Sequence, residues 1–224
     1  MRPALILPAR NEAGALPHVL SRVPASLGAA VIVVDNGSVD RTAAVAAAAG
    51  AVVVSESRQG YGWACLAGTR RACELGCDAL VFLDADGSMP PEDVSLLLGP
   101  ISCGKADLVL GARRLTPGAM PTHQRLANRV IAHLLRSHGV HVSELGPFRA
   151  IRTSTWISLG MSGSRFAWPA EMLARAASAG ARISEVPVGY SPRITGRSKV
   201  GGSLRGTVAA TWEIGRLLLA GAPR

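Results

Sequence analysis

The chain has 224 residues, 48% of them hydrophobic, so it can bury a sizeable core as a single domain spanning residues 1–224. Its formal charge is +9, with arginine far more frequent than lysine, which suits anionic partners such as nucleotides, phosphates or lipid headgroups. No apolar stretch approaches the roughly 20 residues of a membrane-spanning helix, and the start lacks a signal-peptide pattern. We expect a cytoplasmic protein, with at most a peripheral contact at the inner face of the membrane.

Short apolar runs alternate with helical segments in the first half of the chain. We expect strands at 4–7, 31–34, 52–54, 79–83 and 108–110, and helices at 15–22, 41–49, 63–75 and 92–98. Gly50 and Gly76 stand where left-handed helix caps are expected, and Asp40 is a candidate N-cap. This alternation predicts an α/β fold, with a mostly parallel sheet flanked by helices.

The second half is less regular. We expect a loop at 115–121, helices at 124–137 and 170–179, strands at 148–152 and 183–188, a mobile loop at 191–203 and a final helix at 204–219. Gly180 should end the second of these helices. We find no internal repeat and no linker that would divide the chain.

Cysteine and histidine show no spacing typical of a metal cluster or a disulfide framework. The cysteines are Cys65, Cys73, Cys77 and Cys103. We expect them to be reduced thiols packed as small apolar groups.

The fourth apolar run ends in two carboxylates one residue apart, Asp84 and Asp86, on either side of Ala85. Alternate side chains of a nearly extended chain point the same way, so both carboxylates can face one hard cation and the phosphate oxygens it binds. The end of a buried strand is also where open α/β sheets bind ligands. A solvated turn is the alternative, but the strand before the motif and the helix start after it favour a Mg²⁺ or Mn²⁺ site.

Candidate ligand-binding residues, most of them polar, follow the three earlier strands too. They are Pro8, Arg10 and Glu12 after the first strand, Asp35 and Asn36 after the second, and Arg58 and Gly60 after the third. These strand ends should share one edge of the sheet and form one crevice. The carboxylates and the amide could bind a base, a ribose or a sugar hydroxyl, the arginines could bind a diphosphate, and the glycine would let backbone approach the ligand. Helix capping, turn formation and solvated arginines are the alternatives.

Taken in order, these blocks resemble the nucleotide-sugar-binding half of the family 2 glycosyltransferases, which have the GT-A fold. The match covers residues 4 to 113 through I-L-P-A-R-N-E, V-V-D-N-G-S-V-D-R-T, R-Q-G-Y-G-W-A, F-L-D-A-D-G-S-M-P-P and G-A-R. The resemblance implies a Rossmann-like sheet, a nucleoside-diphosphate sugar held by residues 1–113, an acceptor held by residues 114–224, and inversion by direct attack.

Motifs in the second half resemble the polyprenyl-phosphate hexosyltransferases of the dolichol-phosphate mannose synthase type. They are L-G-P-F-R-A-I-R at 145–152, W-P-A-E-M around Glu171, V-P-V at 186–188 and G-R-S-K at 196–199. The resemblance makes Asp86, Arg113 and Glu171 catalytic candidates. It also implies that Arg113, Arg197 and Lys199 gather an acceptor phosphate and the transferred sugar, with a merely solvated basic loop as the alternative.

Two departures from that group affect the chemistry. Ser88 stands where the group commonly has a glutamine, which leaves the third metal ligand open. Glu171 is followed by Met172 instead of the aspartate that many family 2 enzymes use as a base. The second departure fits an acceptor that is already anionic, since an ionised oxygen needs positioning more than deprotonation. Glu171 acting as a base on a hydroxyl, or simply pairing with a nearby arginine, are the other interpretations.

The sequence thus predicts metal-dependent transfer of a hexose from a nucleoside-diphosphate sugar to an acceptor, with polyprenyl phosphate favoured and a small soluble acceptor as the alternative. A nucleotidyltransferase would need a glycine-rich phosphate loop that residues 8–12 do not provide. A non-catalytic nucleic-acid-binding protein would explain the charge, but carboxylates at the strand ends repel phosphates unless a metal intervenes. The sugar, the nucleotide and the oligomeric state are left open.

Overall fold

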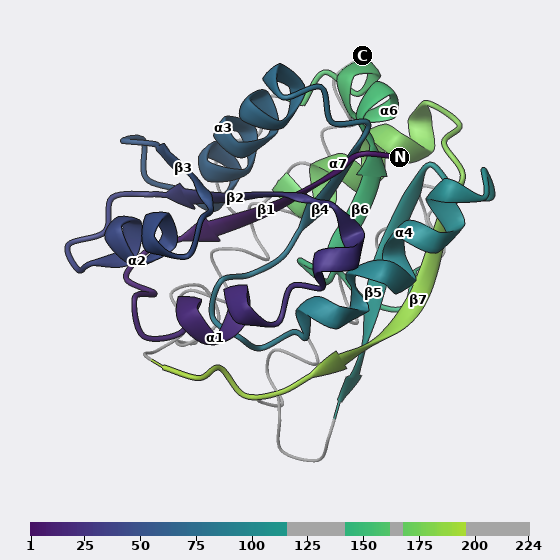
Figure 1. Ribbon diagram of the computed structural model, residues 1–224. Coiled ribbons are helices and arrows are strands. Elements are labelled where there is room, and N and C mark those ends of the chain that lie inside the picture. Colours follow the sequence, from purple (N-terminus) through teal and green to yellow (C-terminus); the bar gives the residue numbers. More distant parts are fainter. Residues whose placement is uncertain (116–141, 162–167, 196–224) are drawn as a thin grey trace, which may run out of the picture.

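A seven-stranded sheet between two layers of helices forms the core of the computed structural model, which describes residues 1–115, 142–161 and 168–195 (Figure 1). The strands are β1 (Pro3–Ala9), β2 (Ala30–Asp35), β3 (Val52–Ser55), β4 (Ala79–Phe82), β5 (Leu108–Leu115), β6 (Arg149–Arg152) and β7 (Ile183–Tyr190). Their order across the sheet is β3-β2-β1-β4-β6-β5-β7. All neighbouring pairs are parallel except the two that involve β6.

Helices cover both faces of the sheet. One face carries α1 (Leu16–Ser21), α2 (Thr42–Ala48) and α4 (Val94–Ser102), and the other carries α3 (Tyr61–Glu74), α6 (Thr153–Ser158) and α7 (Trp168–Ser178). Two short 3₁₀ turns, η1 (Ala25–Leu27) and η2 (Pro91–Asp93), precede β2 and α4. No helix among these described residues is both long and apolar enough to cross a bilayer.

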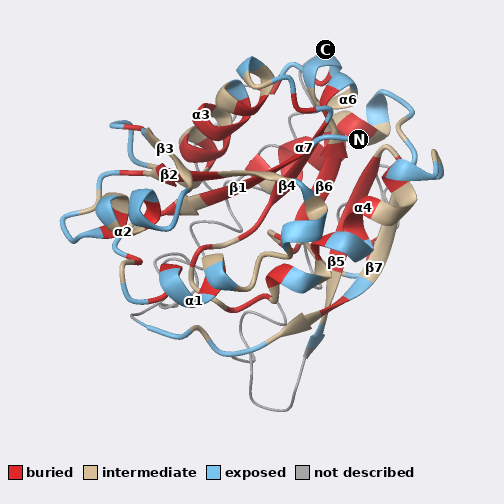
Figure 2. Cartoon of the chain, viewed as in Figure 1, coloured by how far each residue is buried: buried red, intermediate tan, exposed pale blue. Residues whose placement is uncertain are grey.

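The central strands are apolar throughout because both of their faces are buried (Figure 2). Along β1, Ile6 packs with the α3 and α7 side, whereas Leu5 and Leu7 pack with the α1 and α4 side. Helix α3 lies very close to the sheet at Gly68, where a Cβ would come within 2.5 Å of the Ile6 Cγ2 atom. The glycine therefore fixes how closely this helix approaches β1 and β2.

The topology gathers many chain segments at one edge of the sheet. Strands β1 to β4, β5 and β7 all end at this edge, and antiparallel β6 begins there. The loops that follow the parallel strands therefore converge, as expected for the ligand-binding edge of an open α/β sheet.

The predicted strands and helices of the described region are present with shifted ends, and Gly50, Gly76 and Gly180 all have positive φ. Helix α6 was not predicted. The prediction of Asp40 as N-cap is wrong, because Arg41 occupies that position, although Asp40 still accepts the Thr42 N–H at 2.9 Å. All four cysteines are free, but Cys103 is exposed, so it is not the buried apolar group that we expected. The predictions for 116–121, 124–137, 196–203 and 204–219 lie outside the described residues.

Candidate active site

The two carboxylates of the Asp84-Ala85-Asp86 segment lie just beyond β4 at the converging edge. The Leu83 N–H donates to the Ile6 carbonyl at 3.1 Å, so the chain stays beside β1 as it leaves the strand. Ala85 is buried, and the turn continues through Gly87 at φ 75°. The Ser88 N–H donates to Asp86 Oδ1 at 2.9 Å, which fixes the orientation of that carboxylate.

Asp84 is held in an environment that disfavours its charge. The Asp84 residue reaches solvent only in part, and burial raises the pKa of its carboxyl to about 7, with the negative charge of Asp86 as the next cause. The nearby Arg113 guanidinium acts in the opposite direction. A cation placed between the two carboxylates would therefore relieve an unfavourable concentration of negative charge.

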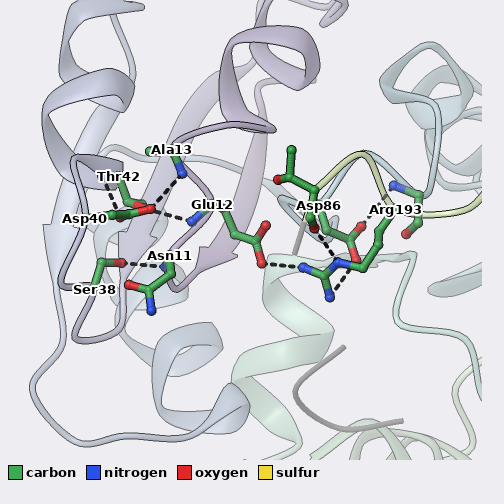
Figure 3. A network of polar contacts seen from close by, with 10 residues as sticks. Asn11, Glu12, Ala13, Ser38, Asp40, Thr42, Asp86 and Arg193 are labelled. Atoms are coloured by element: carbon green, nitrogen blue, oxygen red, sulfur yellow. Dashed lines mark hydrogen bonds and ion pairs between the residues drawn. The ribbon is translucent and has the colours of Figure 1, made fainter. Parts of the chain in front are cut away.

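Glu12 reaches the same site from the loop after β1 (Figure 3). Asn11 adopts φ 54°, a left-handed conformation that asparagine tolerates better than most residues. Its side-chain oxygen accepts the Val39 N–H at 2.8 Å, and its own N–H donates to Ser38 Oγ at 3.0 Å. These bonds, together with the Glu12 N–H donated to Thr42 Oγ1 at 2.9 Å, brace the loop against the β2 side.

Arg193, which follows β7, reaches both carboxylate segments (Figure 3). Its Nη2 atom lies 2.7 Å from Glu12 Oε1, and its Nη1 atom lies 3.8 Å from Asp86 Oδ2. Arg193 is not among the site residues predicted from the sequence. Nothing in its local sequence distinguishes it from other arginines, and only the end of β7 at this edge brings it to the carboxylates.

The predicted nucleotide-side residues Asp35 and Asn36 lie at the end of β2. Asp35 Oδ1 accepts the Ser38 N–H at 2.9 Å, a bond that shapes the turn. Asn36 is buried, and its amide group donates to the carbonyls of Glu56 and Arg58 and accepts the Gly60 N–H at 2.8 Å. The Asn36 side chain therefore holds the β3 loop in place.

Arg58 is half exposed in that loop and lies above the Trp63 ring, with 4.0 Å from its guanidinium carbon to the ring centre. The same guanidinium binds Glu56, with 2.7 Å from Nη2 to Oε2, and this bond is the main reason that the pKa of Glu56 falls to about 2. Pro8 lies within β1 and Arg10 directly follows the strand, half-buried. The structure thus brings the predicted residues of the first half to one edge.

Arg113 on β5 is paired within the protein. Its Nη2 atom lies 2.7 Å from Glu144 Oε2, its backbone N–H also donates to Glu144, and the Tyr190 ring centre lies 5.1 Å from its guanidinium carbon. Glu144 was not predicted as a site residue. The pairing orients the Arg113 side chain, which lies close enough to Asp84 for the two charges to influence each other.

Glu171 on α7 is buried and pairs with Arg175, with 2.9 Å between Oε1 and Nε. Arg175 also donates to the Leu159 carbonyl at 3.0 Å. Arg149, at the start of β6, is fully buried, donates to the carbonyls of Pro169 and Gly146, and has its pKa lowered to about 10 by burial. Arg149 is also absent from the site residues predicted from the sequence.

The described residues supply only a partial metal shell. Among them, no group of three or more histidine, cysteine or acidic side chains could hold a cation. Two adjacent carboxylates fit Mg²⁺ or Mn²⁺ nonetheless, because Mg²⁺ is commonly bound by one or two carboxylates, with substrate phosphates and waters completing the octahedron. The donor set therefore suits a metal that arrives with a diphosphate.

Comparison with known proteins identifies the family. The model of glycosyl transferase family 2 matches residues 4–167. The chain belongs to this family. It is 41% identical to an uncharacterized glycosyltransferase of Mycobacterium tuberculosis over 96% of each chain. It is 32% identical to an undecaprenyl-phosphate mannosyltransferase of Micrococcus luteus, covering 95% of this chain and 97% of that protein.

Solved structures show the same fold. The glucosyl-3-phosphoglycerate synthase of Mycobacterium tuberculosis, crystallised with Mn²⁺, uridine diphosphate and phosphoglyceric acid, superposes with a TM-score of 0.77. That match has 24% identity and covers 100% of this chain and 80% of the synthase. These comparisons confirm the predicted GT-A architecture and the prediction of a glycosyltransferase. The roles of individual site residues stay predictions, and Arg197 and Lys199 lie outside the described residues.

Proposed function

We propose that this glycosyltransferase moves a hexose from a nucleoside-diphosphate sugar to polyprenyl phosphate, with Mg²⁺ or Mn²⁺ bound by Asp84 and Asp86. The observation that carries the proposal is the meeting of Asp84, Asp86 and Glu12 at one sheet edge, with Arg113 close to Asp84. The bound metal would withdraw charge from the diphosphate leaving group.

The first half of the chain, residues 1–113, binds the nucleotide sugar in this proposal. Asp35 lies at the end of β2 beside the loop that Asn36 braces, so a base or ribose would contact an edge whose shape is already fixed. Gly60 adopts φ 148°, which lets the backbone turn into α3 without a side chain facing the ligand. Glu12 can accept a hydrogen bond from a sugar hydroxyl.

Residues 114–224 hold the acceptor. A lipid phosphate is favoured because Glu171 pairs with Arg175, and an anionic oxygen needs no base to become a nucleophile. Arg113, together with Arg197 and Lys199, supplies the positive charge that positions an acceptor phosphate. The relatives support a lipid acceptor, since one is named undecaprenyl-phosphate mannosyltransferase and another polyprenol monophosphomannose synthase. Contact with a membrane surface follows from such an acceptor.

Transfer to a small soluble acceptor is the second candidate. Glucosyl-3-phosphoglycerate synthase shares the fold and has been crystallised with phosphoglyceric acid, which also carries a phosphate group. The phosphate of either acceptor would meet the same cations. The two candidates differ in whether the lipid chain is required and in the nucleophile, which is a phosphate oxygen in the lipid and a hydroxyl in a soluble acceptor that keeps its phosphate.

Radiolabelled UDP- and GDP-hexoses incubated with Mn²⁺ and either a short-chain polyprenyl phosphate or 3-phosphoglycerate test the proposal. We expect label on the lipid phosphate. Asp84→Asn and Asp86→Asn should each lower transfer at least a hundredfold with unchanged circular dichroism, because the substitution removes charge from the metal site and conserves shape. Asp107→Asn is the matched control, since Asp107 pairs with Arg182 at the opposite edge of the sheet. Near-normal transfer by either site variant would refute the assignment.

A further inference from the structure

Among the described residues, Arg193 contacts two carboxylates of this site, those of Glu12 and Asp86. Its guanidinium joins Glu12, at 2.7 Å, to Asp86, at 3.8 Å, and its Nε atom donates to the Thr195 carbonyl at 2.7 Å (Figure 3). The Arg193 side chain is 19% exposed and the Glu12 side chain 8%, so the closer ion pair is largely withdrawn from water. The pair therefore interacts more strongly than a surface ion pair would.

The backbone around Arg193 is docked on the metal-binding segment. The Ser191 N–H donates to the Ser88 carbonyl at 2.8 Å, and the Ile194 N–H donates to the Asp86 carbonyl at 3.0 Å. Ile194 also covers Gly87 so closely that a Cβ on that glycine would lie 2.3 Å from Ile194 Cδ1. Residues 191–195, which we call the strap, therefore lie along the Asp86–Ser88 turn, and two hydrogen bonds fix the main chain of the strap there.

The opposite side of the strap touches the loop after β1. A Cβ on Gly14 would lie 3.2 Å from the Thr195 Cγ2 atom, so the strap spans from the metal-binding turn to the Glu12 loop. With the main chain held on both sides, the guanidinium can leave Asp86 only by rotation of the Arg193 side chain.

We infer that Arg193 competes with the divalent metal for the site carboxylates, so that metal and nucleotide diphosphate bind as a unit. Two neighbouring cations near one carboxylate repel each other, and the Asp84 and Asp86 pair supplies too few ligands to hold a metal strongly alone. A diphosphate brings both the missing oxygen ligands and the negative charge onto which the Arg193 guanidinium can turn. The inference rests on the proposed function, because it assigns Asp84 and Asp86 to the metal.

The competition has a measurable sign. Removing the charge of Arg193 makes the net charge around Glu12, Asp84 and Asp86 more negative. Mn²⁺ should then bind more tightly to the nucleotide-free protein. A brace that only holds the strap predicts the reverse, since its loss would loosen the metal-binding turn. Lysine keeps the charge and loses the fork, so Arg193→Lys separates charge from shape.

Mn²⁺ titrations followed by electron paramagnetic resonance, on the full chain with and without UDP or GDP, test the inference. For Arg193→Gln without nucleotide we expect Mn²⁺ affinity to rise about tenfold, while Arg193→Lys stays close to the wild-type protein. Arg71→Gln, which removes an equal charge from an exposed pair on α3, should change nothing. Nucleotide should raise the Mn²⁺ affinity of the wild-type protein more than that of Arg193→Gln, because only in the wild-type protein does the diphosphate draw a competing cation away from the carboxylates.

Equal or weaker Mn²⁺ binding by Arg193→Gln, with its unfolding transition still cooperative, would overturn the inference. If Arg193→Gln does not fold, the test rests on Arg193→Lys. A Mn²⁺ affinity like that of the wild-type protein, raised strongly by UDP or GDP, supports the competition. Tighter Mn²⁺ binding by the lysine variant overturns it. A wild-type protein that binds no Mn²⁺ even with UDP or GDP would instead contradict the proposed function.

Discussion

Asn36 and Asp84 both stand at strand ends, but their surroundings give them different tasks. Asn36 uses its donors and its acceptor on the loop at Glu56, Arg58 and Gly60. Asp84 lies near the charges of Asp86 and Arg113, and burial raises the pKa of its carboxyl to about 7. A residue's place in a motif therefore does not show whether its polar atoms face a ligand or the protein.

This difference limits what the sequence can predict at the residue scale. The strand ends could be located from apolar runs, which placed Glu12, Asp35 and Asp86 at one edge. The partners of these residues come from distant segments, such as Arg193 for Glu12 and Glu144 for Arg113. Pairs of that kind depend on the order of the strands, which apolar periodicity does not encode.

Glu171→Gln tests whether the acceptor needs a base. Because Glu171 pairs with Arg175 and an anionic phosphate needs no deprotonation, we expect single-turnover transfer to fall only a few-fold, whereas loss of a general base costs about a hundredfold or more. Breaking the buried pair should also lower the free energy of unfolding by up to about 3 kcal/mol, which urea denaturation would measure. A hundredfold loss with nucleotide binding preserved would favour a hydroxyl acceptor instead.

Glu56 should make stability depend on pH in a defined window. Its pKa is about 2 in the folded protein, chiefly because Arg58 binds it, and 4.5 is its ordinary value. The ionised form therefore stabilises the fold above about pH 4.5, and this contribution is lost as the pH falls from about 4.5 to about 2.

Glu56→Gln removes that contribution. In urea denaturation, the stability difference between the wild-type protein and this variant should be larger at pH 6 than at pH 3. Glu74→Gln, at the exposed Arg71 pair of α3, serves as the control and should produce a small difference at both pH values. A difference for Glu56→Gln that does not shrink toward pH 3 would show that the Arg58 pairing adds nothing to stability.

At the scale of the elements, the sequence located each strand of the described residues but not every strand end. Both faces of β1 and β4 are covered, so their apolar runs are continuous and easily recognised. Strand β5 extends to Leu115, past its apolar start, because eight residues pair with β7 although the strand becomes basic at Arg113. Backbone pairing with a distant strand, not side-chain pattern, determines that end.

Two helix glycines allow a matched test of packing. Gly68 on α3 would place a Cβ 2.5 Å from Ile6 Cγ2 and 2.9 Å from Val34 Cγ2, whereas Gly99 on α4 has no atom within 4 Å of its Cβ position. Gly68→Ala should therefore lower the free energy of unfolding by about 1–2 kcal/mol, since overpacking outweighs helix propensity. Gly99→Ala should raise it by up to about 1 kcal/mol, as judged by urea denaturation. Equal effects would show that α3 can move away from β1 without loss.

At the scale of the whole molecule, strand order converts a linear sequence into a site. Strand β7 is the outermost strand of the order β3-β2-β1-β4-β6-β5-β7, and it ends at the same edge as β1 and β4. Residues 191–195 then lead back to the Asp86–Ser88 turn, which is why Arg193 can meet Glu12 although 181 positions separate them. Because β6 is antiparallel to its neighbours, its first residue, Arg149, lies at the edge where the other strands end. Neither placement follows from the chain's apolar pattern.

The net charge of +9 leads to a prediction for the molecule as a whole. If the acceptor is a lipid phosphate, the protein must work at a bilayer surface, where each nearby Lys or Arg contributes about 1 kcal/mol of attraction to anionic lipid. We expect the full chain to sediment with phosphatidylglycerol-containing vesicles at low salt. It should be released as the salt concentration rises, because the Debye length shrinks to about 10 Å at 0.1 M.

Neutral phosphatidylcholine vesicles are the control and should leave the protein in the supernatant. When a small fraction of polyprenyl phosphate is added to these vesicles, transfer to the lipid should become measurable, with weaker sedimentation than on phosphatidylglycerol. Arg197→Ala combined with Lys199→Ala should reduce transfer at vesicles much more than nucleotide binding measured by calorimetry. Efficient transfer to 3-phosphoglycerate, without sedimentation on anionic vesicles at any salt concentration, would mean that the positive charge serves a soluble acceptor and that the lipid assignment is wrong.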